Sequence, residues 1–183
     1  MHIIRPPEYL VMPWKNGGGT TTELCACPRG AAAFDWRASI AVVNQNGPFS
    51  AFGGYERHIM VLSGNGMRLE IAGRGTFELQ PFEPVSFSGE VQVVGVLSEG
   101  GVQDFNLIVR RTFGCGLLRV MDFEPGEEIG SEDGLRFFYL LEGGCHFGDD
   151  IILYPNDSFW LDRGEHIRLT AFMKAVVCAI TPR

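Results

Sequence analysis

The sequence lacks any long apolar run. A helix that crosses a membrane needs about 20 consecutive apolar residues, and no stretch of these 183 residues comes near that length. The first ten residues also lack the apolar core of a signal peptide, because Pro6, Pro7 and Glu8 stand in its place. We therefore expect a soluble, cytoplasmic protein that has no membrane as partner.

Lysine is scarce, and negative charge outnumbers positive charge. Two of the 15 basic residues, Lys15 and Lys174, are lysines, which leaves 15 − 2 = 13 arginines, and the net charge is −7. Non-specific nucleic-acid binding depends on clustered basic residues, so no nucleic-acid partner is expected. Arginine grips a carboxylate at two points and lysine does not, so the arginine bias fits anion binding. A GC-rich genome would produce the same bias.

Helical periodicity is also missing. No stretch repeats apolar residues at the i, i+3, i+4, i+7 spacing for more than a turn or two. Short runs rich in β-branched and aromatic residues alternate with glycine turns instead, which predicts an all-β sandwich or barrel. The predicted strands are Trp36 to Val43, Ile59 to Leu62, Met67 to Ile71, Val91 to Leu97, Leu117 to Met121, Phe137 to Leu141, Ile151 to Tyr154 and Ala175 to Ile180.

The five cysteines form an odd count without the spacing of a disulfide framework or a zinc site. Cys25 and Cys27 are too close together for either, and a strand would place both side chains on one face. Buried free thiols in a reducing compartment are therefore expected.

One motif occurs twice. The segment from Arg57 to Gly64 recurs from Arg136 to Gly143, and in each an arginine stands seven residues before a glycine that closes an apolar strand. Each copy is followed by a second strand and a glycine turn. Two duplicated β-barrels explain this pattern. Coincidence between two strand-turn-strand segments is the alternative.

A strand that ends in Leu-x-Gly, followed by another strand and a Gly turn, resembles one half of a cupin. Metal-binding cupins carry two His and a Glu in the first motif and a third His in the second. The corresponding positions here fall near Ser50 and Phe52, on Arg57, and on Gln92, and the chain has no His-x-His pair. The resemblance therefore implies cupin halves without a metal, and no other cofactor is expected.

Longer motifs in the first 110 residues resemble the HutD/Ves family. These are Pro13 to Thr20 with Glu23, Asp35 to Ala41, Gly47 to Phe52 with Arg57, and Asp104 to Leu107 with Arg110. The resemblance implies an all-β bicupin, which is two fused antiparallel β-barrels of the double-stranded β-helix type in one compact unit. Residues 1–112 are expected to form the half that carries the ligand site, and residues 113–183 a degenerate second half.

The family is associated with histidine utilisation and is thought to restrain that pathway. The resemblance therefore implies a regulator that binds a small carboxylate such as urocanate or formylglutamate, with a homodimer as a candidate assembly. The alternative is a metal-independent enzyme, an isomerase or hydrolase acting on such an intermediate. An enzyme needs a proton-transfer group, for which Lys15, Glu23 and Asp104 are candidates. The resemblance supplies no established reaction and no catalytic residue.

The segment Trp14-Lys15-Asn16 precedes three glycines, whose backbone N–H groups would approach a ligand closely or form an anion-binding nest. On spacing alone, a Gly-rich turn before an edge strand is an equal alternative. Further on, Arg37 and Ser39 fall on one face of a predicted strand, where they would line a barrel pocket. An exposed polar sheet face is the alternative there.

Arg57 places a permanent cation where a metal-binding cupin has an anionic ligand. A buried arginine needs a counter-charge, and either a ligand carboxylate or Asp104 would supply it. Asp104 and Asn106 share one face of a strand, whereas Arg136 in the second half is followed by a packed aromatic wall and is not expected to bind. The predicted site, without a metal, consists of Trp14, Lys15, Asn16, Arg37, Ser39, Phe52, Arg57, Asp104 and Asn106.

Overall fold

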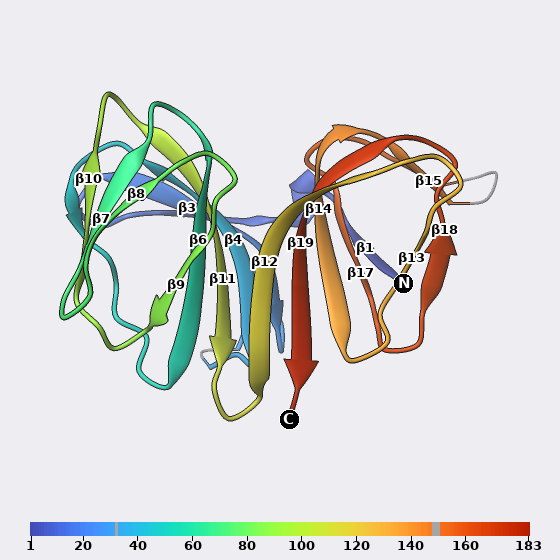
Figure 1. Cartoon of the computed structure of the whole chain (residues 1–183), viewed down its shortest axis with the longest axis horizontal. Coiled ribbons are helices and arrows are strands. Elements are labelled where there is room, and N and C mark those ends of the chain that lie inside the picture. Colours follow the sequence, from blue (N-terminus) through green and yellow to red (C-terminus); the bar gives the residue numbers. More distant parts are fainter. Residues whose placement is uncertain (32, 148–150) are drawn as a thin grey trace. The chain divides into compact units, whose positions relative to one another are not determined.

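The computed structural model describes residues 1–31, 33–147 and 151–183, and within these ranges the fold is all-β. The helical content of that part is one 3-10 turn, η1 (Pro6–Glu8), and no helix in it has the length or apolar content to cross a bilayer. The strands divide between two compact units, Leu10–Phe113 and Gly114–Arg183 together with Met1–Tyr9 (Figure 1).

The Leu10–Phe113 unit contains two antiparallel sheets. The larger has the order β2 (Leu10–Pro13), β3 (Gly19–Cys27), β4 (Trp36–Val43), β11 (Val102–Arg110), β6 (Tyr55–Ser63) and β9 (Val85–Ser88). The smaller has the order β5 (Gly47–Pro48), β10 (Val93–Leu97), β7 (Met67–Ile71) and β8 (Gly75–Leu79).

Alternation along the strands packs these two sheets face to face. In β7, Met67, Leu69 and Ile71 are buried, whereas Glu70 between them is exposed. They join one apolar cluster with residues of β4, β6, β10 and β11. This cluster fills one part of the space between the sheets.

The second unit has one five-stranded sheet and two short ribbons. The sheet has the order β1 (His2–Ile4), β17 (Ser158–Leu161), β14 (Leu135–Gly143), β19 (Met173–Pro182) and β12 (Gly114–Phe123). The ribbons pair β13 (Glu128–Gly130) with β18 (His166–Arg168), and β15 (Cys145–Phe147) with β16 (Ile151–Leu153). Apolar side chains fill its interior, where the rings of Phe138 and Phe159 stack with centroids 4.6 Å apart.

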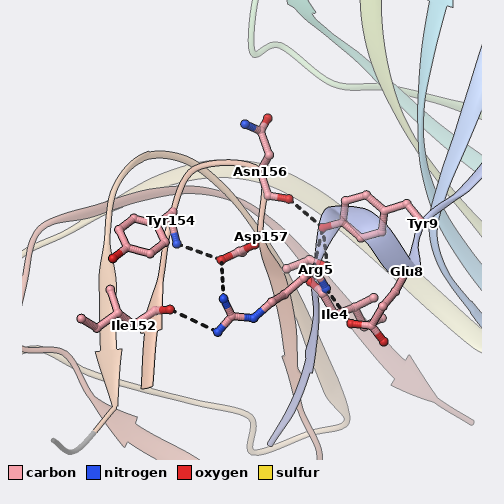
Figure 2. Close-up of polar contacts among 9 residues, drawn as sticks. Ile4, Arg5, Glu8, Tyr9, Ile152, Tyr154, Asn156 and Asp157 are labelled. Carbon is pink, nitrogen blue, oxygen red and sulfur yellow. Dashed lines mark hydrogen bonds and ion pairs between the residues drawn. The ribbon is translucent and has the colours of Figure 1, made fainter. Parts of the chain in front are cut away.

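The first nine residues belong to this second unit, which differs from the boundary expected at residues 1–112. β1 pairs with β17, and the Tyr9 hydroxyl donates a hydrogen bond to the Asn156 carbonyl at 2.7 Å (Figure 2). Arg5 reaches the Ile152 carbonyl and the carboxylate of Asp157. Sequence reasoning missed this because a three-residue strand and a 3-10 turn leave almost no periodic signal.

The repeated motif has the same backbone irregularity in both copies. In β6, Leu62 is left out of the pairing with β11, and in β14, Leu141 is left out of the pairing with β19. These two bulges lie as far apart in sequence as Arg57 and Arg136. A matching bulge at matching positions is a stronger sign of duplication than the sequence pattern alone, because a bulge has no fixed residue requirement.

Candidate functional site

A cavity of about 480 Å³ lies within the Leu10–Phe113 unit, and it brings together most of the predicted site residues. Eight of the nine line it, namely Trp14, Lys15, Asn16, Arg37, Ser39, Phe52, Arg57 and Asn106. The ninth, Asp104, is fully buried behind the wall. On β4, Arg37 and Ser39 share one face, as predicted. This face lines the cavity, and the alternative of an exposed polar sheet face does not hold.

Arg57 forms the buried end of the cavity. Its Nη1 donates to the Ser50 carbonyl at 3.0 Å and its Nη2 to the Asn106 Oδ1 at 2.7 Å. The Nε is buried without a partner among the described residues, and each Nη nitrogen has a second N–H donor beyond the one that it uses. Phe49 and Phe52 flank the guanidinium at 5.2 and 5.4 Å. Burial lowers the pKa of Arg57 to about 10, which leaves it charged at neutral pH.

Of the two candidate counter-charges for Arg57, a ligand carboxylate and Asp104, the structure shows no direct pair with Asp104. The amide of Asn106 lies between them, with its Oδ1 accepting from Arg57 and its Nδ2 donating to Asp104 Oδ1. Asp104 Oδ2 has no partner in the described part of the chain. Burial raises the pKa of Asp104 to about 7, against the opposing effects of the Arg57 charge and the Asn106 hydrogen bond.

Arg37 adds a second guanidinium to the lining. Arg37 on β4 and Arg57 on β6 are both register partners of Ile108 on the strand between them. Arg37 lies over the rings of Phe34 and Phe52, at 5.0 and 5.1 Å, and its Nε is also without a partner in the described ranges. Burial lowers its pKa. Both cations therefore share the Phe52 ring.

The Trp14-to-Thr20 segment contains the hairpin turn between β2 and β3, at residues 14–18, and the first two residues of β3. The turn contributes to the cavity wall. Its backbone donors are used inside the turn, since Gly17 N–H donates to the Trp14 carbonyl and Gly18 N–H to Asn16 Oδ1. These two glycines therefore do not form the anticipated anion-binding nest. Lys15 is exposed, and the Trp14 indole is fixed by a 2.8 Å hydrogen bond to Thr21.

The lining does not fit a metal ion. A guanidinium and an aromatic ring stand at positions where metal-binding cupins have ligands, and neither binds a divalent cation. No group of three or more His, Cys, Asp or Glu side chains able to hold a metal occurs in residues 1–31, 33–147 or 151–183.

A sequence model of the HutD family matches residues 7–179. The chain belongs to the HutD family. Protein Ves from Citrobacter koseri is 36% identical over 157 residues, which are 85% of this chain and 81% of that protein. A Pseudomonas putida protein described as an uncharacterized 21.2 kDa protein in the hutC 3' region is 47% identical over 109 residues, 59% of this chain and 57% of the relative.

Solved structures show the same fold. HutD from Pseudomonas fluorescens SBW25 (formate condition) superposes with a TM-score of 0.79 at 30% identity, covering 99% of this chain and 98% of that one. A cupin 2 conserved barrel domain protein from Leptotrichia buccalis has a TM-score of 0.59 at 12% identity, with 88% of each chain covered. The HutD-family fold of this chain is therefore cupin-like.

In the second unit of this HutD-family chain, apolar residues stand at the positions that correspond to Asp104 and Asn106. Matching the two bulged strand pairs places Ala175 at the position of Asp104 and Val177 at that of Asn106. Both residues are buried in the apolar cluster. Arg136 is exposed beside a hollow of about 170 Å³ and has no such amide or carboxyl behind it.

Sequence reasoning missed part of the HutD-family cavity. Phe49 packs on Arg57, the Ser50 carbonyl accepts its hydrogen bond, and Gln45 lines the wall. Phe49 and Ser50 stand in a segment that carried the family resemblance, which was the available signal. A backbone acceptor has no residue-type signature, so the role of Ser50 could not be read from the sequence.

Proposed function

We propose that this protein binds a small carboxylate and regulates histidine utilisation in the cytoplasm, as a bicupin with its ligand site in the Leu10–Phe113 unit. Family membership and the relative from the hutC 3' region support the pathway. The two arginines that line the cavity support a carboxylate as ligand.

The observation that carries the proposal is the state of Arg57. It is 5% exposed, lines the cavity, forms no ion pair with a carboxylate among the described residues, and has N–H donors that no described residue accepts. An unpaired buried cation is unfavourable, and a ligand carboxylate relieves it through charge-assisted hydrogen bonds. Aromatic rings on either side hold the guanidinium plane in place for such a ligand.

The second guanidinium favours formylglutamate over urocanate. Arg37 also lacks a hydrogen-bonding partner at Nε, and a ligand with one carboxylate neutralises only one of the two arginines. Formylglutamate carries two carboxylates, whereas urocanate carries one. We expect formylglutamate to bind more tightly, and a mutant at Arg37 to reduce this preference.

Calorimetric titration of three variants tests the site. An arginine–carboxylate hydrogen bond contributes about 1.5–3 kcal/mol, so Arg57→Ala should weaken formylglutamate binding about ten- to a hundred-fold. Arg57→Lys should recover little, because an ammonium does not reproduce the planar two-point grip. Arg136→Ala is the matched control in the second unit and should retain wild-type affinity. Loss of binding in the control alone would place the site in the other unit.

A metal-independent isomerase or hydrolase is the second candidate function. The unusual pKa of Asp104 favours it, since a carboxyl that titrates near neutrality suits proton transfer. Asp104 does not line the cavity, however, and Lys15 stands exposed at its rim. Incubation with urocanate and formylglutamate, followed by absorbance and mass spectrometry, separates the two functions. Saturable binding without product supports the regulator, and turnover supports the enzyme.

A further inference from the structure

Asp104 is a fully buried carboxyl group in apolar surroundings. Its cross-strand partners are Ala41 on β4 and Val61 on β6. Both belong to the apolar cluster that fills the space between the two sheets, to which β7 and β10 contribute Met67, Leu69 and Val93. Among the groups packed around Asp104, Arg57 is the charged group that acts on it. Asn106 is the polar group that forms a hydrogen bond with it.

The Asn106 amide is oriented in a way that tolerates either protonation state of Asp104. Asp104 Oδ1 accepts from the amide Nδ2, and this contact needs no proton on the acid. Oδ2 has no partner among the described residues, so a proton placed there breaks no hydrogen bond. Protonation would therefore change the charge behind Arg57 and leave the amide contacts in place.

A ligand carboxylate changes the electrostatics of this group of residues. Without ligand, Arg57 opposes the effect of burial on Asp104 and favours its ionised form. A bound carboxylate places one negative charge beside Arg57 and so offsets the positive charge that favours ionised Asp104. This favours the protonated form of Asp104, because losing a nearby positive charge raises a carboxyl pKa.

We propose that Asp104 makes anion binding proton-linked: one proton passes from solvent to Asp104 as a ligand carboxylate becomes the counter-ion of Arg57. This inference rests on the proposed function, since it concerns the same cavity. It gives Asp104 a role in setting affinity without touching the ligand, so Asp104 is a positioning and tuning residue and not a catalytic one.

The sign of the pH dependence follows from linkage. In the ligand-free protein the pKa of Asp104 is raised to about 7, so at lower pH the carboxyl is protonated both with and without ligand. Affinity is then constant. At higher pH binding requires proton uptake, and affinity falls by up to about tenfold per pH unit until the pKa of the complex is reached. The protein therefore binds anions best on the acidic side of neutrality.

Calorimetric titration with formylglutamate between pH 6 and pH 8.5 tests the inference. Carboxyl groups of this kind titrate near pH 4, so the ligand itself does not change charge in this range, whereas the imidazole of urocanate would. Wild-type protein should lose about tenfold or more in affinity across the range. Titrations in HEPES and in Tris, whose ionisation enthalpies differ, should report uptake of up to one proton per ligand at pH 8.

Asp104→Asn is the decisive variant, because an amide at this position keeps the acceptor for Asn106 and resembles the neutral acid. It should bind with the affinity that the wild type has at pH 6, vary less than about twofold across the range, and take up no proton. Glu70→Gln removes one negative charge from the exposed face of β7 in the same unit, and it should keep the wild-type pH profile.

The outcomes separate this inference from the proposed ligand. Formylglutamate binding without proton uptake, or the same pH profile in Asp104→Asn, would overturn the inference while leaving the ligand in place. If formylglutamate does not bind, the ligand assignment is wrong and formate becomes the probe for the same measurements. Formate binding that is independent of pH overturns the inference, and a cavity that binds neither anion overturns both proposals.

Discussion

At the scale of single residues, the cavity shows how a protein holds an arginine in its interior without a carboxylate against it. Arg57 contacts a backbone carbonyl, an amide oxygen and aromatic rings, all of which are neutral. Neutral partners leave the cation available to an anion, whereas a direct ion pair with Asp104 would compete with the ligand. The Asn106 amide therefore keeps the Asp104 carboxyl from pairing directly with Arg57.

The stability of the ligand-free protein should also report on Asp104. Its folded pKa of about 7 lies above the unfolded value of 3.8, so its contribution to stability is full below about pH 4 and is lost as pH rises toward 7. Asp104→Asn has no such titration. We therefore subtract the free energy of unfolding of the wild type from that of the variant. This difference should rise between pH 4 and pH 7 by at most about 1.4 kcal/mol per pH unit, and should stay constant above pH 7.

Urea-induced unfolding at pH 5, 6, 7 and 8 measures this difference. Glu70→Gln provides the comparison, because it removes a carboxylate from the surface and its difference from wild type should stay nearly constant over the same range. A constant difference for Asp104→Asn as well would mean that Asp104 is ionised throughout and that burial does not hold its proton.

At the scale of elements, the hairpin between β2 and β3 depends on a close backbone approach at Gly19. A Cβ there would lie 2.2 Å from the Val42 carbonyl oxygen and 3.0 Å from the Trp14 ring. A backbone oxygen in the middle of a paired strand cannot move aside easily. The hairpin that carries Trp14, Lys15 and Asn16 to the cavity therefore requires glycine at this position.

Gly19→Ala should lower the free energy of unfolding by about 1–3 kcal/mol, as overpacking of an interior contact does, and weaken formylglutamate binding several-fold. Chemical denaturation and calorimetric titration measure the two effects. Gly53→Ala is the matched control, since a Cβ at Gly53 meets no atom within 4 Å, and it should stay within about 0.5 kcal/mol of wild type. Equal stability of both variants would show that the strand shifts to accommodate the methyl group.

How far the sequence predicts these elements depends on how regular they are. Trp36 to Val43 and Met67 to Ile71 were predicted with their observed ends. Both are rich in β-branched and apolar residues, and in Met67 to Ile71 every second residue is buried. β8 and β9 were missed, since short strands with exposed polar residues look like loops. Asp104 and Asn106 alternate in the sequence in the same way whether Arg57 contacts Asp104 directly or through the Asn106 amide. Only the structure distinguishes the two arrangements.

At the scale of the whole molecule, the cavity and the anchored N-terminal segment lie in different units. Every residue that lines the 480 Å³ cavity belongs to Leu10–Phe113. Tyr9 belongs to the other unit, where its hydroxyl contacts the Asn156 carbonyl at 2.7 Å (Figure 2). The same hydroxyl lies 3.0 Å from the Ser158 hydroxyl. Tyr9→Phe should lower the free energy of unfolding by about 1 kcal/mol and leave carboxylate affinity unchanged.

Thermal or urea unfolding and a parallel titration check both statements. Tyr154→Phe is the control within the same unit, because the Tyr154 ring is 58% exposed and its hydroxyl makes no hydrogen bond in the described ranges. A fall in affinity in Tyr9→Phe would mean that the segment Met1–Tyr9 influences the cavity and that the two units do not act separately.

The pairing of β1 with β17 also sets an order of events on the ribosome. Ile4 in β1 pairs with Ser158 in β17. Because β1 precedes Leu10–Phe113 in the chain and β17 follows it, β1 has no partner strand while Leu10–Phe113 is being synthesised. Domains made first generally fold first during synthesis. A nascent chain that has passed Phe113 therefore already contains every residue that lines the cavity, whereas the β17 partner of β1 has not yet been synthesised.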